Sequence, residues 1–280
     1  MKITKARVAL AAGVGAIAIA AAPAIADHAW NNYHWAKSGA EVTVPIYDST
    51  TGIWQQRGHV GIAVNDWNKS TVIQSSLSRG NSDPSCPIVG GEINVCNDDY
   101  GATGWVGIAS ITTGGRRDPH ITGGVTKLND YYFNQPYYNN DTWRQLVTCQ
   151  EIGHDYGLGH QNENFNTDET TSCMEYTSNA AGNEHPDAHD YEMLLDIYAH
   201  SDGGTGGTTG PGNGGGKGKK NRVETGDHPS EWGRAIASDA SGRPNVFERQ
   251  VGHEFVITHV TWAIGEGPQR GGGNHDRHDH

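Results

Sequence analysis

The residues with the clearest chemical potential lie in the stretch QEIGHDYGLGH, which begins at Gln150. Gln150 and His154 are four residues apart, so they share one face of a helix, and Glu151 lies beside them. Gly157 can adopt the left-handed conformation that ends a helix, which lets the chain turn and return His160 to the same point. Gln150, His154 and His160 can therefore converge on one metal ion.

This combination of residues suits zinc. The ion acidifies a bound water and polarises a peptide carbonyl, while a neighbouring carboxylate, here Glu151, carries the proton to the leaving amine. A Gln side chain reaches about as far as imidazole, and its carbonyl oxygen can bind a metal. Because zinc prefers imidazole nitrogen, we expect Gln150 to weaken the site without emptying it.

The stretch resembles the signature H-E-x-x-H-x-x-G-x-x-H of metzincin zinc proteases, with Gln150 in place of the first His. Downstream, the run SCMEY resembles the Met-turn of the same clan: Met174 would lie beneath the zinc, and Tyr176 would approach it and stabilise the oxyanion. The resemblance implies a secreted zinc endopeptidase with Glu151 and Tyr176 as catalytic residues. It implies three metal ligands, Gln150, His154 and His160.

The resemblance also implies a fold and a substrate-binding strand. It covers residues 42–200 and implies an α+β catalytic domain with a twisted mixed sheet, an active-site helix, a Met-turn and a C-terminal helix. Residues 104–110 are similar to the edge strand to which a peptide substrate adds as an extra strand. Substrate contacts are then expected at Trp105, Val106, Gly107 and Ile108, and residues 120–129 resemble the strand that leads towards the active-site helix.

Four cysteines in an exported chain indicate two disulfides, with three possible connectivities. We favour Cys86–Cys96, because it closes a short local loop. The metzincin resemblance gives a reason for Cys149–Cys173, since this bond would tie the active-site helix to the Met-turn and preserve the shape of the metal site.

Residues 1–26 have the features of a secretory signal peptide: basic residues, a short apolar run and a final Ala-Ile-Ala. Its removal would change the net charge from −12 to −15. An acidic chain is a poor partner for nucleic acid or anionic membranes. We therefore expect a secreted, extracellular monomer that acts on a peptide or protein substrate, with no membrane association after signal cleavage.

Hydrophobic periodicity and capping residues divide the catalytic region, residues 27–200, into elements. We expect a strand at 42–47, at an edge of the sheet because of Pro45, and a helix from Val60 that runs into a strand at 71–74. Further helices should begin near Asp141 and at Pro186, the last one ending near Tyr198.

The rest of the chain has a different composition. Residues 201–221 form a Gly-rich flexible linker, residues 222–265 a small β-rich segment, and residues 266–280 a Gly/His-rich tail. The β-rich segment should contain strands at 234–238, 246–249 and 254–263, and its small size favours docking on the catalytic domain. Three roles stay open for this segment: cell-wall recognition, covering the cleft, or stabilising the fold.

Several residues have alternative interpretations. Residues 97–100, NDDY, are a candidate loop for structural Ca²⁺, although a polar turn fits their sparse spacing better. His185, His189 and His200 could support the zinc site, but capping and hydrogen bonding explain them more simply. Because Gln150 departs from the motif, the alternative function is a catalytically inactive metzincin-like pseudoenzyme whose cleft binds peptides or protein partners.

Overall fold

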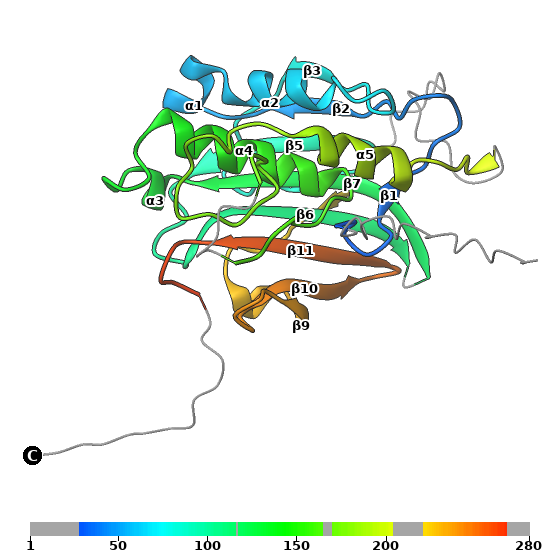
Figure 1. Cartoon of the computed structure of the whole chain (residues 1–280). Helices are drawn as coiled ribbons and strands as arrows, with labels where there is room; N and C mark the ends of the chain where they lie inside the picture. The colour runs from blue at the N-terminus through cyan, green and yellow to red at the C-terminus, as the bar shows by residue number, and fades with distance from the viewer. Residues whose placement is uncertain (1–27, 116, 165–169, 204–220, 268–280) are drawn as a thin grey trace, which may run out of the picture.

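A computed structural model describes residues 28–115, 117–164, 170–203 and 221–267. The expected signal peptide, most of the Gly-rich segment and most of the C-terminal tail lie outside these residues. The described chain is α+β, as the sequence predicts, with one large mixed sheet and helices packed on it (Figure 1). None of the described helices combines the length and apolar character that a membrane span requires.

The main sheet has the strand order β3-β2-β5-β7-β6-β11-β10-β9, with β1 paired to β7. Strands β3, β2, β5 and β7 are parallel, and the later pairs are antiparallel. The bounds are β1 (His34–Trp35), β2 (Pro45–Asp48), β3 (Ser76–Arg79), β5 (Ile93–Asp98), β6 (Trp105–Gly115), β7 (Asp118–Asn129), β9 (Arg234–Ser238), β10 (Pro244–Val251) and β11 (Glu254–Trp262). A small separate sheet pairs β4 (Ile88–Val89) with β8 (Arg222–Val223).

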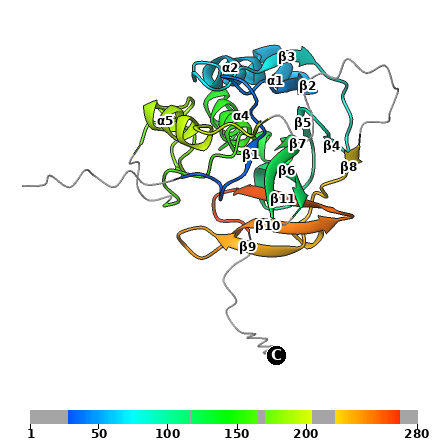
Figure 2. The same ribbon diagram turned by 90° about the vertical axis from the view of Figure 1, so that its right-hand side faces the viewer.

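The longer helices lie over one face of the sheet, and the two views show α4 and α5 on that face (Figures 1 and 2). The main apolar core lies between α4 and the sheet, and it includes Trp67, Val106, Leu146 and Ile152. The helices are α1 (Gly52–Arg57), α2 (His59–Trp67), α3 (Asp130–Phe133), α4 (Asp141–Asp155) and α5 (Ala188–Ile197), with a short 3₁₀ helix at Pro229–Glu231.

Helix α4 begins and ends where its sequence predicts. The Asn140 side chain caps it by accepting a hydrogen bond from the Trp143 N–H. Beyond its end, Gly157 has φ +94°, and a Cβ at this position would collide with the carbonyl of Tyr33. A glycine is therefore required at this turn, which directs the chain towards His160.

Both expected disulfides are present, Cys86–Cys96 and Cys149–Cys173. The second connects α4 to the loop that contains Met174. The same loop approaches the helix at Gly153, where an added Cβ would lie 2.5 Å from the Met174 sulfur. The covalent link and the close packing together fix the separation of α4 and this loop.

Three expectations about secondary structure need correction. Residues 71–74 are not a strand: they contribute one isolated bridge, Val42 to Ile73, and the strand begins later, as β3. Strand β2 lies between β3 and β5, so Pro45 is not at a sheet edge. A proline is tolerated there because it is the first residue of the strand. Helix α5 begins at Ala188 instead of Pro186, because Asp187 caps it.

The β-rich C-terminal segment continues the main sheet. Strand β11 pairs with β6 over eight residue pairs, from Phe255 opposite Thr113 to Trp262 opposite Trp105. Ahead of β9, Asp227 binds the buried Lys127 of β7 with an Nζ–Oδ1 distance of 2.7 Å, and its carbonyl accepts a hydrogen bond from the Trp105 indole. The segment is thus docked on the edge that β6 would otherwise expose.

The close approach of α4 to the Met174 loop yields a stability prediction. Gly153→Ala should destabilise the fold by about 1–3 kcal/mol, because the added methyl would overlap Met174 and Trp67. Urea denaturation of the two proteins would measure the difference. The matched control is Gly61→Ala in α2, where the new Cβ would lie 3.6 Å from Leu77 and should be neutral or slightly stabilising. Equal stability of Gly153→Ala and the parent would contradict this packing.

Candidate metal centre

Three buried histidines from two distant parts of the chain form a group whose potential ligand atoms all lie within 4.8 Å of one another. His154 is on α4, His160 follows the turn at Gly157, and His259 is on β11. The Nε2 atoms of His154 and His160 are 3.2 Å apart, and the His259 ring stacks on that of His154 at 3.8 Å between centroids. We call this the three-histidine group.

The surroundings of His154 and His259 favour neutral imidazoles. The Nδ1 atom of His154 is 2.7 Å from the Leu158 carbonyl, so Nδ1 carries the proton and the Nε2 lone pair faces the group. Burial, reinforced by the neighbouring histidines, lowers the pKa of His154 and of His259 well below the usual value. Neutral imidazole is the form that binds a metal ion.

The group fits the requirements of zinc. Zinc–nitrogen bonds of about 2.0–2.1 Å in a tetrahedral site place neighbouring nitrogens about 3.3 Å apart, close to the 3.2 Å between His154 and His160. The Nδ1 atom of His259 is buried and has no hydrogen-bond partner in the described structure. A divalent cation held by these nitrogens would accept lone pairs that are otherwise buried.

The neighbouring Glu151 is completely buried and points towards β6. An added Cβ on Gly107 would lie 2.6 Å from its Oε1, so the absence of a side chain at Gly107 makes room for the carboxyl group. Burial raises the pKa of Glu151 well above its usual value, opposed by the Thr261 hydroxyl. Glu151 is thus a titratable group enclosed by protein, the kind of environment in which proton-transfer residues are found.

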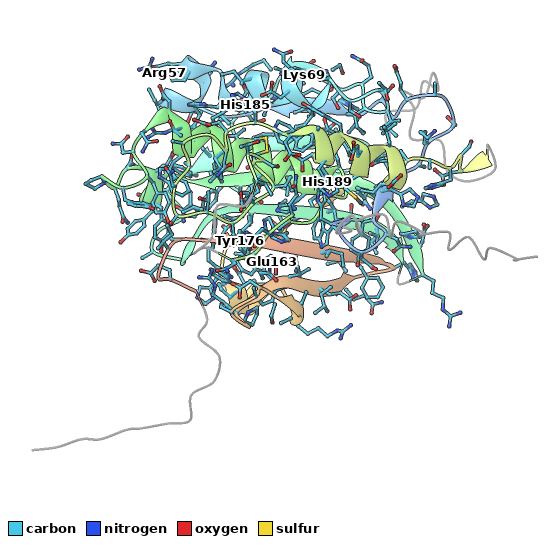
Figure 3. The ribbon with its side chains drawn as sticks, viewed as in Figure 1. Arg57, Lys69, Glu163, Tyr176, His185 and His189 are labelled. Atoms are coloured by element: carbon cyan, nitrogen blue, oxygen red, sulfur yellow. A yellow bond between two sulfur atoms is a disulfide. The ribbon has the colours of Figure 1, made fainter. Side chains whose placement is uncertain are left out.

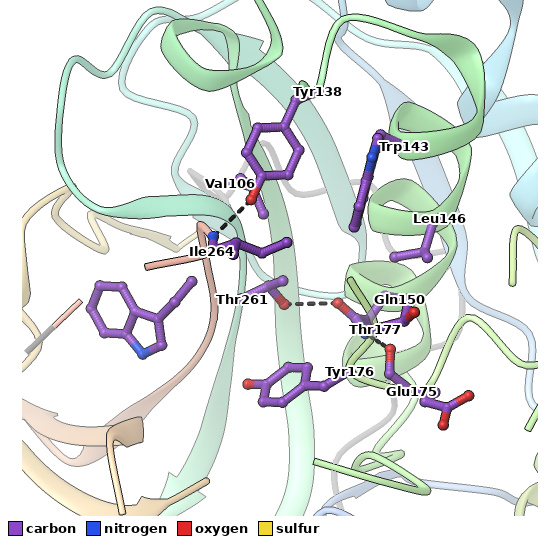
Figure 4. Close-up of a pocket in the computed structure, with 11 residues that line it drawn as sticks. Val106, Tyr138, Trp143, Leu146, Gln150, Glu175, Tyr176, Thr177, Thr261 and Ile264 are labelled. Atoms are coloured by element: carbon purple, nitrogen blue, oxygen red, sulfur yellow. Dashed lines mark hydrogen bonds between the residues drawn. The ribbon is translucent and has the colours of Figure 1, made fainter. Parts of the chain in front are cut away.

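The side chain of Gln150 is occupied by hydrogen bonds. Its oxygen accepts one from the Thr261 hydroxyl at 2.9 Å (Figure 4), and its amide donates to the carbonyls of Cys173 and Glu175. The sequence assigns the third ligand position to Gln150. The structure instead brings a third imidazole, His259, to His154 and His160.

Tyr176 and Met174 lie close to the group. The Tyr176 ring packs on His160 with 3.9 Å between centroids, and its hydroxyl donates to the Val260 carbonyl on β11. Figure 3 shows Tyr176 close to Glu163, whose carboxylate is 3.5 Å from His160 Nδ1. The Met174 sulfur lies against α4 at Gly153, the residue before His154.

Strand β6 lies inside the sheet, which corrects the expectation that Trp105, Val106, Gly107 and Ile108 form a sheet edge. All four residues are buried, and β6 is paired with β7 on one side and β11 on the other. The reason is that β11 itself adds to the edge, in the manner expected of a substrate. Thr261 lies opposite Gly107, and Val260 opposite Ile108.

The pocket beside the three-histidine group is also partly filled by the C-terminal segment (Figure 4). One side is formed by Leu146 and Gln150 of α4 together with the chain around Tyr176. The other side includes Thr261 and Trp262 of β11. The remaining residues that line the pocket are Val106, Tyr138, Trp143, Glu175, Thr177 and Ile264. The C-terminal segment therefore forms one wall of this pocket.

The remaining candidate residues lie elsewhere. In the expected calcium loop, Asn97 binds Asp130, and the Asp99 carboxylate accepts from the N–H of Gly101. Among the described residues, the loop belongs to no cluster of three or more potential metal ligands. His185 binds Asp66 at 2.6 Å, away from the three-histidine group.

Sequence reasoning did not identify His259. It is an isolated histidine in a strand, 99 residues after His160, and no local spacing connects it to the motif. The period-two alternation of β11 indicates only which side chains share a face. Its role depends on the antiparallel register with β6, which places it opposite Ala109.

Comparison with known proteins adds no family to this picture. No protein-family model matches the chain, and no curated protein matches it. The chemistry assigned to the three-histidine group therefore derives from its geometry and from the motif that contains two of its members.

The two possible ligand sets make opposite predictions for zinc affinity. His259→Ala should weaken zinc binding at least tenfold, because it removes an imidazole from the group. Gln150→Ala should change the affinity much less, because its oxygen is bonded to Thr261. Competition with a chromophoric chelator would measure both zinc affinities. In every protein compared, the tail histidines His275, His278 and His280 are changed to Gln. A larger loss for Gln150→Ala than for His259→Ala would contradict the assignment.

Proposed function

We propose that the chain is a zinc-dependent endopeptidase of the metzincin type, held closed by its C-terminal strand. The observation that carries this proposal is the convergence of three buried imidazoles. Two of the imidazoles belong to the motif that resembles the metzincin signature, and Glu151 occupies the place of its glutamate. In the closed form, His154, His160 and His259 would hold the metal.

Bound zinc would supply a Lewis acid for the peptide carbonyl and acidify a water molecule. The chain's own residues would complete the chemistry. Glu151 would accept the proton of the attacking water and return it to the leaving amine. The Tyr176 ring packs on His160, and its hydroxyl, once released from the Val260 carbonyl, would donate a hydrogen bond to the oxygen that becomes negatively charged.

A substrate that binds as an extra strand would need the edge of β6, which β11 covers. The same pairing protects the edge from unspecific association with other strands. A peptide can enter only after β11 has moved away from β6. The structure described here is thus proposed to be a latent form.

Three consecutive residues of β11 hold three groups of the proposed site. His259 belongs to the three-histidine group, the Val260 carbonyl accepts the hydrogen bond of Tyr176, and Thr261 donates to the Gln150 oxygen. Departure of β11 would therefore remove one imidazole and free the Tyr176 hydroxyl and the oxygen of Gln150, whose amide would stay bonded to the loop. We propose that Gln150 then replaces His259 as a ligand, which would give the open form the ligand set expected from the sequence.

The second candidate function is a non-catalytic strand-binding protein. The pairing of β6 with β11 favours it, because it shows that β6 accepts an antiparallel strand over eight residue pairs. In that case the cleft would bind an extended peptide in place of β11 without cutting it. The two functions differ in whether Glu151-dependent cleavage follows once β11 is displaced.

Hydrolysis of fluorescein-labelled casein by the zinc-loaded chain would distinguish them. Val260→Pro should increase the rate, because a proline in β11 weakens its pairing with β6. The matched control is Ala237→Pro in β9, a strand that pairs with β10 and not with β6. This control should leave the rate unchanged, and thermal unfolding would verify that both variants fold.

Glu151→Gln in the Val260→Pro background should reduce casein hydrolysis at least a hundredfold while zinc remains bound. Adding Gln150→Ala to Val260→Pro should also reduce hydrolysis, and should weaken zinc binding more than Gln150→Ala does alone. A folded, zinc-loaded Val260→Pro variant that binds casein without cleaving it would overturn the peptidase proposal and support the strand-binding protein.

A further inference from the structure

We propose that the chain has a second metal site, for Zn²⁺ or a similar divalent transition-metal ion, formed by His34, His200 and Asp202. We call these residues the second histidine group. Their potential ligand atoms lie within 4.8 Å of one another. The group shares no residue with the three-histidine group, so this inference is independent of the proposed function.

The distances in the second histidine group are those of ligands arranged around one ion. Nε2 of His200 is 3.0 Å from Nε2 of His34 and 3.1 Å from Oδ1 of Asp202, and the third distance, His34 to Asp202, is 3.7 Å. A tetrahedral zinc ion with bonds of about 2.0–2.2 Å separates its ligand atoms by about 3.3–3.5 Å. The observed values lie on both sides of this range.

The orientation of His34 is that of a metal ligand. Its Nδ1 atom is 2.7 Å from the Asn32 carbonyl, so Nδ1 carries the proton and the Nε2 lone pair faces His200 and Asp202. A backbone partner of this kind is typical of metal-binding histidines, because it fixes the tautomer and the ring.

A neutral His200 can donate a hydrogen bond in only one of its two close contacts. The single proton on Nε2 of His200 can serve either His34 or Asp202, both about equally close. When it serves Asp202, the lone pair of His34 receives no proton from His200. A bound cation would satisfy both nitrogens and the carboxylate oxygen together.

His120 completes the surroundings of the site. Its Nε2 lies 3.1 Å from the same Oδ1 of Asp202, and its Nδ1 lies 2.6 Å from Asp118. His120 thus lies between the two carboxylates and orients Asp202. Asp202 also accepts a hydrogen bond from the Lys37 N–H. The carboxylate is therefore held in position before any metal binds.

The site would join three segments that surround the end of α4. His34 is on β1, His120 is on β7, and His200 and Asp202 follow α5, at the right-hand end of the sheet in Figure 1. Next to His34, the Trp35 indole donates to the carbonyl of Asp155 at the end of α4. A metal here would stabilise the packing of the first described segment against α4, which is a structural role.

Zinc stoichiometry and thermal unfolding of the full chain test this proposal, with His275, His278 and His280 changed to Gln to remove tail binding. The parent should bind two zinc ions. His34→Gln and Asp202→Asn should each lose one, or bind it at least tenfold more weakly. Addition of the second equivalent of zinc should raise the unfolding temperature of the parent but not that of these variants.

Three comparisons make the result specific. His185→Gln removes a histidine that binds only a carboxylate, Asp66, and should retain both zinc ions. His200→Gln changes a half-exposed side chain, so it should fold normally and still lose one ion. His259→Ala should weaken the other site and leave this one intact. Two zinc ions of unchanged affinity in His34→Gln, His200→Gln and Asp202→Asn, or no second ion in the parent at micromolar zinc, would overturn the proposal.

Discussion

The antiparallel pairing of β11 with β6 is the interaction on which the rest of the site depends. Without it, the motif on α4 would present two histidines and a glutamine, and β6 would be an open edge. With it, His259 enters a fully buried space beside His154. The pairing is supported by Ser110 and Thr258, whose hydroxyls are 2.9 Å apart, and by packing of Trp105 and Trp262 in one apolar cluster.

A second constraint is the rigid relation between α4 and the loop that follows the motif. The bond between Cys149 and Cys173, the contact of Gly153 with Met174 and the hydrogen bonds from Gln150 to this loop all act within two turns of the helix. Gln150 therefore has a structural role in the closed form, since its amide binds the loop. A histidine at this position would lack the two amide hydrogens that make these bonds.

Much of the α4 region could be predicted from the sequence, because the signals there are local. Asn140 as a cap, the glycine at 157 and the pair Cys149–Cys173 each depend on residues close in sequence or on a compact motif. The prediction of a strand at 71–74 is wrong, because a short apolar run does not specify with which strands it pairs. Strand pairing depends on neighbours far along the chain. His259 and the second histidine group were missed for the same reason: their members are separated by 99 and by 166 residues.

The most direct test of the central claim is a crystal structure of the zinc-loaded full chain with anomalous scattering recorded at the zinc edge. The account predicts a zinc peak bonded at about 2.0–2.1 Å to His154, His160 and His259, with β11 paired to β6 and Gln150 bonded to Thr261. A peak at this helix with Gln150 as a ligand and His259 turned away would contradict it, as would the absence of zinc from the three-histidine group.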